Sequence, residues 1–178
     1  MSKETISITI QPTATEDIPD ALGLINSVPE AVLPLTEQQL QQRIDAGLSY
    51  VAKNEEGTIV GHQSAIVWEQ SGIPEIGSAV VAEECRGNGI STRLKTTVIK
   101  RVQSLYPDKP IVAFTEAASK SRGIVQRLNF EPVSMDSIPE EFFGVCPKSE
   151  DRCYGKTKSS PPDCGCVIFM LKPKGKAK

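Results

Sequence analysis

The sequence contains a glycine-rich segment, Glu83-Glu84-Cys85-Arg86-Gly87-Asn88-Gly89-Ile90-Ser91-Thr92, between an apolar run and an amphipathic one. Residues 76–81 before it are apolar and rich in β-branched side chains, which is typical of a strand. After it, apolar residues recur at helical spacing and form one face of a predicted helix: Ile90, Leu94, Val98, Val102 and Leu105. The basic residues of this segment fall mostly on the other faces of that helix. The pattern predicts a strand, a tight glycine turn and an amphipathic helix.

Such a turn is suited to binding phosphate groups. The first N–H groups of a helix lack intrahelical acceptors, and the helix dipole places partial positive charge there. Gly87 and Gly89 allow unusual backbone angles and close approach of a ligand. Arg86 adds a cation, and Ser91 and Thr92 add hydroxyl donors. The candidate phosphate cradle is Arg86, Gly87, Asn88, Gly89, Ile90, Ser91 and Thr92.

The spacing in this turn excludes two common phosphate loops. No Lys follows Gly89 as a Walker loop requires, and Thr92 stands where the dinucleotide fingerprint has its third glycine. The turn instead resembles the acyl-CoA pyrophosphate loop of the GNAT superfamily of N-acetyltransferases, [QR]-x-x-G-x-[GA]. Arg86 and Gly89 match that pattern, and Ser91 replaces the final small residue.

A second segment, residues 116–130, resembles another GNAT motif, N-x-x-[AS]-x-x-x-Y-x-K-x-G-F. Ser121 matches the small position, and Asn129 stands where a helix commonly stops in the left-handed conformation. The family's Asn, which contacts pantetheine, falls on Ala118, although Ser119 or Ser121 can donate a similar hydrogen bond. The family's Tyr, which often protonates the leaving thiolate, falls on Val125. The leaving thiolate would therefore be protonated by another acid or by water, or would leave without an acid.

The rest of the chain agrees with a mixed α/β fold. Strands are predicted at residues 6–10, 49–53, 58–68, 75–81, 111–115 and 166–171, and helices begin near residues 15, 36 and 90. The GNAT resemblance, which spans about residues 6–133, implies an α/β (α+β) fold with a mixed, mostly antiparallel seven-stranded sheet and about four helices. We expect one domain over residues 1–178, with residues 138–178 forming a Cys-rich loop and a closing strand.

The resemblance also implies how acetyl transfer would occur. The amine attacks the thioester directly, and Ala79, Val80 and Val81 would contact pantetheine and the thioester carbonyl. Glu75 lies near the place where histone-acetylating relatives carry their catalytic Glu, and an exposed turn carboxylate is the alternative. His62, the single histidine, could titrate near neutrality and act as base, or be structural. Cys85 has no evident His partner, which argues against a covalent nucleophile.

Four cysteines crowd the C-terminal segment: Cys146, Cys153, Cys164 and Cys166. Four thiolates can complete a tetrahedral structural zinc site, but their spacing is not the usual paired C-x-x-C form. Buried unligated cysteines and redox pairing are the other interpretations, and the residues alone do not choose between them.

Composition excludes several classes of function. A net charge of −2 and a pI near 5.6 argue against general nucleic-acid binding. No apolar run reaches membrane-span length and no signal peptide is evident, so we expect a cytoplasmic protein. Its five cysteines are then expected to be reduced thiols or metal ligands rather than disulfides. The GNAT resemblance leaves a homodimer open.

The sequence therefore predicts an acetyl-CoA-dependent N-acetyltransferase that acts on a primary amine of a small molecule or a peptide. A non-catalytic acyl-CoA-binding regulatory module, with or without a stabilising metal, is the alternative, since the motif Tyr is missing. A cysteine-rich metal or redox sensor built on the same fold is the third hypothesis.

Overall fold

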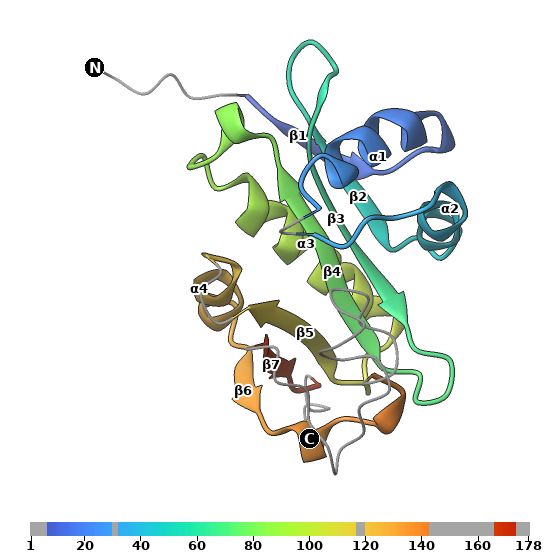
Figure 1. Cartoon of the computed structure of the whole chain (residues 1–178), viewed down its shortest axis with the longest axis vertical. Helices are drawn as coiled ribbons and strands as arrows, with labels where there is room; N and C mark the ends of the chain where they lie inside the picture. The colour runs from blue at the N-terminus through green and yellow to red at the C-terminus, as the bar shows by residue number, and fades with distance from the viewer. Residues whose placement is uncertain (1–6, 30–31, 117–119, 143–165, 174–178) are drawn as a thin grey trace. The chain divides into compact units, whose positions relative to one another are not determined.

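The computed structural model describes residues 7–29, 32–116, 120–142 and 166–173. Within these ranges the chain forms seven strands and four α-helices (Figure 1). In chain order they are β1 (Thr9–Pro12), α1 (Ile18–Asn26), α2 (Glu37–Asp45), β2 (Ser49–Lys53), β3 (Ile59–Val67), β4 (Pro74–Val81), α3 (Ile90–Leu105), β5 (Ile111–Glu116), α4 (Lys120–Arg127), β6 (Glu131–Val133) and β7 (Cys166–Leu171).

The strands form one mixed sheet in the order β1-β2-β3-β4-β5-β7-β6. The β1–β2, β2–β3, β5–β7 and β6–β7 pairs are antiparallel, and β4 pairs with β5 in parallel at Glu75 and Val112. This architecture confirms the seven-stranded, mostly antiparallel sheet with four helices that the sequence predicts. Chain contacts divide the protein into two compact units, Met1–Ile66 with Ile76–Leu105, and Val67–Glu75 with Tyr106–Lys178. The expectation of a single domain stays a prediction.

In the first unit, helices cover both faces of the strands (Figure 1). Because side chains alternate along a strand, Val51 of β2 joins the cluster beneath α1 and α2, while Ala52 joins the cluster beneath α3. The α3 cluster includes Ile90 and Leu94, and Gly61 of β3 lets this helix approach closely: a Cβ there would lie 3.0 Å from Leu94 Cδ1. The start of α3 is thus held firmly against β3.

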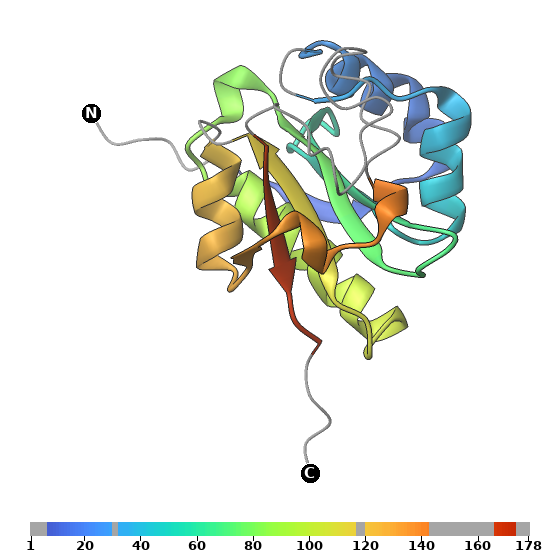
Figure 2. The same cartoon turned by 60° about the horizontal axis from the view of Figure 1, so that its bottom comes forward.

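The second unit is built on β5, β7 and β6, and Figure 2 shows β5 and β7 side by side with α4 nearby. One face carries a cluster of Val112, Ile138, Phe142 and Ile168. The rings of Trp68 and Phe142 are in contact, with centroids 4.5 Å apart and planes tilted by 41°. This aromatic cluster reaches the first residues of β4, because Trp68 also donates a hydrogen bond to Glu75.

Several predicted boundaries agree with the structure and others shift. The predicted ends of β2 and β7 and the span of α3 are confirmed. Of the strand predicted at residues 6–10, Ile6 lies outside the described residues and β1 begins at Thr9. Leu105, which the spacing assigned to the apolar face, is 40% exposed. In the part of the chain that the structure describes, no helix is long and apolar enough to cross a membrane.

Candidate functional site

The glycine turn between β4 and α3 has the backbone that the sequence predicts. A short 3-10 turn, Glu83–Cys85, follows β4. Gly87 and Gly89 then adopt left-handed φ angles of 83° and 74°, which side chains with a Cβ rarely tolerate. No atom lies within 4 Å of where a Cβ on Gly89 would stand, so the space beside this residue is open. The glycines are therefore required by the turn, and one of them leaves an open approach.

The positive end of α3 is directed to this turn. The first helical hydrogen bond runs from the Arg93 N–H to the Gly89 carbonyl, at 3.0 Å. The N–H groups of Ile90, Ser91 and Thr92 precede this bond, so the helix itself gives them no acceptor. Gly89, at the cap position, has no side-chain oxygen to bind them. A bound anion would meet these N–H groups and the helix dipole together.

Side-chain hydrogen bonds fix the shape of the turn. Arg86 Nε donates to the Val81 carbonyl at 3.0 Å, which ties this exposed side chain to the end of β4. Asn88 Nδ2 donates to the Cys85 carbonyl at 3.1 Å. The guanidinium of Arg86 is thus held at the end of β4, and no described residue accepts a hydrogen bond from its terminal amino groups.

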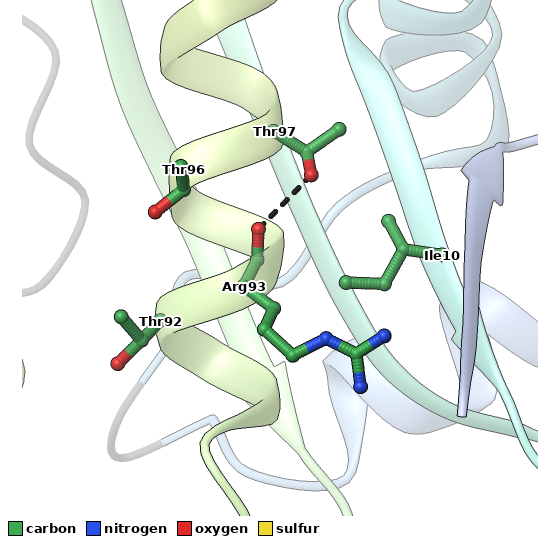
Figure 3. A pocket seen from close by; sticks show the side chains of 5 residues that line it. All are labelled: Ile10, Thr92, Arg93, Thr96 and Thr97. Atoms are coloured by element: carbon green, nitrogen blue, oxygen red, sulfur yellow. Dashed lines mark hydrogen bonds between the residues drawn. The ribbon is translucent and has the colours of Figure 1, made fainter. Parts of the chain in front are cut away.

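An open pocket of about 380 Å³ adjoins the turn on the flank of α3 (Figure 3). Its lining residues are Ile10, Thr92, Arg93, Thr96 and Thr97. Figure 3 shows Arg93 extending from α3 toward Ile10, and Arg93 Nη2 donates to the Ile8 carbonyl at 2.9 Å. Because Thr92 belongs to both features, the cradle continues into a surface that carries hydroxyl groups.

Strand β4 is kinked just before the residues predicted to contact pantetheine. Ser78 has a φ of 53°, although it lies in the middle of the strand. Its carbonyl accepts from His62 Nδ1 at 3.0 Å, and its hydroxyl accepts from Arg43 Nη1 at 2.7 Å. Ala79, Val80 and Val81 follow this kink and lead into the glycine turn.

His62 does not have the properties that the sequence led us to expect. The ring is fully buried on β3, and this burial lowers its pKa to about 4, with the nearby Arg43 charge acting in the same direction and the Ser78 hydrogen bond opposing both. The expectation of titration near neutrality was therefore wrong. Nδ1 carries a hydrogen, because the Ser78 carbonyl can only accept, and Nε2 accepts from Ser49 Oγ at 3.0 Å. Both ring nitrogens are occupied.

A buried lysine is a feature that the sequence analysis missed. Lys95 is 3% exposed on α3, and burial lowers its pKa to about 8. Its Nζ donates to Gln63 Oε1 at 3.2 Å. A signal existed: Lys95, Ile99 and Val102 share the i, i+4, i+7 spacing of a second buried row, since Ile99 and Val102 are also buried. Lys95 therefore belongs to the buried side of this helix.

Three other residues that the sequence analysis singled out, Glu75, Cys85 and Val125, lie in different surroundings. The Glu75 carboxylate accepts from Trp68 Nε1 at 2.9 Å and is half-buried. Cys85 is buried, and burial followed by the Glu84 charge raises the pKa of its thiol, which agrees with an inert side chain. Val125, at the family's Tyr position, is fully buried on α4. Val125 therefore packs in the core, and its side chain has no acidic hydrogen to donate.

Other predicted residues lie outside the described part of the chain. They are Ser119 and three of the proposed zinc ligands, Cys146, Cys153 and Cys164. The fourth, Cys166, is the first residue of β7. Among the described residues, no group of three or more His, Cys, Asp or Glu side chains is arranged to hold a metal ion. The zinc site stays a prediction.

The sequence profile of the acetyltransferase (GNAT) family matches residues 16–128, more than half of the chain. The chain belongs to the GNAT family. The match covers both the glycine turn and α4. A comparison with curated proteins gives no match.

Solved structures of low sequence identity share the GNAT fold. N-acetylglutamate synthase from Neisseria gonorrhoeae, complexed with coenzyme A and N-acetyl-glutamate, has a TM-score of 0.69 at 16% identity. This match covers 94% of the present chain and 35% of the Neisseria chain, so the present chain spans about a third of that protein.

Two further relatives match over nearly their whole length. Ribosomal-protein-alanine N-acetyltransferase from Brucella melitensis has a TM-score of 0.66 at 20% identity, covering 92% of this chain and 99% of that one. The Salmonella typhimurium protein yncA, bound to acetyl-CoA, has a TM-score of 0.68 at 18% identity, with 96% of each chain covered. At these identities the likeness shows the fold, and the acceptor has to be argued from residues.

Proposed function

We propose that this GNAT acetyltransferase transfers the acetyl group of acetyl-CoA to a primary amine of a small molecule or a peptide. The observation that carries the proposal is the pair of left-handed glycines, Gly87 and Gly89, that leaves the N-terminus of α3 open at the end of β4. The relatives' names include both kinds of acceptor, glutamate in the Neisseria enzyme and a ribosomal protein's alanine in the Brucella enzyme. They do not choose between them for this chain.

The proposed roles follow from the chemistry of each segment. The diphosphate of acetyl-CoA is doubly anionic, and it would lie against the N–H groups of Gly89 to Thr92 and the guanidinium of Arg86. Strand residues Ala79, Val80 and Val81 would offer backbone groups to pantetheine and to the thioester carbonyl. Ser119, beyond the described residues, keeps its proposed contact with pantetheine.

We assign proton removal to Glu75 rather than to His62. The acceptor amine must be neutral before its nitrogen attacks the thioester carbon, and a carboxylate held by Trp68 can accept that proton directly or through water. His62 is buried with both nitrogens bonded, which leaves no lone pair for an amine. As the new amide bond forms and the C–S bond breaks, the departing CoA thiolate would take its proton from water, since Val125 has none to give.

Calorimetric titration of acetyl-CoA into wild-type protein and two Ala variants tests the cradle. Gly89→Ala places a methyl group where the anion would lie, and its left-handed φ adds about 1–2 kcal/mol of strain. Gly57→Ala is the matched control: Gly57 has a φ of 80°, and no atom lies within 4 Å of where its Cβ would stand, but it belongs to the β2–β3 turn. We expect Gly89→Ala to weaken binding at least about tenfold and Gly57→Ala to bind like wild type.

Two results would count against the cradle. Equal affinity in both variants would show that the diphosphate lies elsewhere, and a well-folded wild type that does not bind acetyl-CoA would overturn the proposed function. Arg86→Ala adds an independent arm, because it removes one cation and should weaken binding most at low ionic strength.

The non-catalytic acyl-CoA-binding module remains the second candidate, and the buried Val125 at the Tyr position is the observation that favours it. Release of free CoA thiol, measured over a panel of amines and peptides, separates the two. Tight acetyl-CoA binding with no amine-dependent thiol release would favour the binding module. Zinc analysis of the same preparation tests the four-cysteine site and, with oxidant-dependent affinity, the sensor hypothesis.

A further inference from the structure

The kink at Ser78 needs an explanation. Only Ser78 and Asn129, among the described non-glycine residues, have positive φ angles. Asn129 ends α4, where Asn is well suited to the left-handed conformation. Ser78 lies inside a strand, where such a conformation costs about 1–3 kcal/mol and persists only when its surroundings impose it. Surrounding contacts must therefore hold it in place.

Three side chains from two other elements bind the kink. Two contacts are made to Ser78 itself, by His62 of β3 and Arg43 of α2. The third is made to the preceding residue, where Gln63 Nε2 donates to the Gly77 carbonyl. Since His62 and Gln63 are adjacent on a strand, they reach β4 from opposite faces of the sheet. The kink is held from both sides.

Each of these side chains is itself fixed by a buried partner. Behind His62, Ser49 Oγ bonds to the ring at 3.0 Å and to Thr13 Oγ1 at 2.8 Å. Behind Gln63 lies the Lys95 ammonium. Arg43 Nη1 also donates to Ser64 Oγ at 2.8 Å. We name the four side chains Arg43, His62, Gln63 and Lys95 the β4 clamp.

Burying these polar side chains lowers the stability of the fold, which argues against a purely structural role for the clamp. Burying polar groups costs free energy that hydrogen bonds only partly return, and apolar residues of similar size often stabilise a core better. Six of the eight buried polar residues in the described chain belong to this network: Thr13, Ser49, His62, Gln63, Ser64 and Lys95. Their placement around one kink points to a demand on the backbone there.

We propose that the β4 clamp positions the backbone of Ala79 and Val80 for polarisation of the thioester carbonyl, which makes its members positioning residues for acetyl transfer. The inference rests on the proposed function. A left-handed residue rotates the next peptide group out of the regular strand orientation, so holding Ser78 sets the direction of the groups that follow. The clamp contacts β4 at Gly77 and Ser78, before the glycine turn begins, so it should act on the chemical step more than on affinity.

Infrared difference spectroscopy of bound acetyl-CoA, labelled with ¹³C at the thioester carbonyl, tests this role without knowledge of the acceptor. A hydrogen bond to the carbonyl lowers its stretching frequency. The releasing variants are His62→Leu, which loses both ring contacts, and the double variant Gln63→Leu with Lys95→Met, which replaces both members of a buried pair by apolar groups. His62→Gln is the conservative control, because its amide can still donate to Ser78 and accept from Ser49.

We expect the lowered carbonyl frequency in wild type and His62→Gln, and its loss in both releasing variants at saturating acetyl-CoA. Once an acceptor is known, kcat should fall about 100-fold in the releasing variants, with KM for acetyl-CoA changed far less. Arg86→Ala should show the opposite split, with weak binding but a normal frequency when saturated. If a folded releasing variant keeps the lowered, wild-type carbonyl frequency, the positioning role of the clamp is wrong, while the acetyltransferase proposal is unaffected. Failure of wild type to bind acetyl-CoA overturns both.

Discussion

Mild acid should destabilise this chain through His62. In the unfolded chain the ring has an ordinary pKa of about 6.5, whereas burial lowers the pKa in the folded state to about 4. The unfolded state therefore binds a proton first as the pH falls. The stability that comes from burying a neutral ring is fully present above pH 6.5, is lost progressively as pH falls toward 4, and changes no further below that.

The size of this effect follows from the two pKa values. Each pH unit between them removes at most about 1.4 kcal/mol from the free energy of unfolding. Between pH 7 and pH 5, where the unfolded ring becomes almost fully charged and the folded ring stays neutral, the loss is about 2 kcal/mol. This is a large part of the stability of a typical domain, so urea midpoints should move clearly.

The assay is urea unfolding followed by circular dichroism at pH 7, 6 and 5, for wild type and His62→Gln. Glutamine keeps the hydrogen-bonding pattern and does not titrate, so the difference between the two proteins isolates His62 from the carboxylates. Because the chain has one histidine, proton NMR of its ring gives the folded pKa directly. A folded His62 that titrates near 6.5, or equal pH dependence in both proteins, would refute the buried, doubly bonded ring.

Three further changes probe the surroundings of the site. The pKa of Lys95 is lowered to about 8 in the folded state, so the unfolded state binds more protons above that pH. The unfolding free energy of wild type should therefore rise by about 3 kcal/mol between pH 8 and pH 10.5. Urea unfolding at both pH values should show this rise in wild type but not in Lys95→Met. Gly61→Ala should cost about 1–3 kcal/mol by urea unfolding, since its Cβ would press on Leu94, and an unchanged midpoint would contradict that packing. Leu40→Ala should cost about 2–5 kcal/mol in the same assay, because Leu40 is fully buried in the cluster beneath α1 and α2, and a loss below about 1 kcal/mol would contradict this burial.

Features that depend on neighbouring residues were predicted well. The glycines of the turn and Asn129 have left-handed angles because those residue types tolerate them at little cost. The span of α3 follows from periodicity, and the first hydrogen bond of that helix is accepted by the glycine that precedes it. Conformations that are set by neighbouring residues can therefore be predicted from the sequence.

Features imposed from a distance were not predicted. Ser78 gives no sign of a positive φ, because its kink is held by side chains 16 and 35 residues earlier in the chain. The same distance hides the burial of His62, whose partners lie on other elements. Lys95 was assigned to the polar side of α3 because charged residues usually lie on exposed helix faces, and its hydrogen-bond partner Gln63 lies 32 residues earlier in the chain. Tertiary contacts override residue-type expectation at each of these positions.

The cradle is built by local contacts and the β4 clamp by distant ones, and the two have different proposed roles in the site. The cradle is built from consecutive residues and local hydrogen bonds, from Arg86 to Val81 and from Asn88 to Cys85, so its shape is fixed close to where the ligand would bind. The clamp draws on α2, β3 and α3 at once, so its geometry exists only when the whole first unit is folded. Partial destabilisation of that unit should therefore impair positioning of the thioester before it impairs recognition of the diphosphate. Acetyl transfer would then depend more steeply on fold integrity than cofactor affinity does.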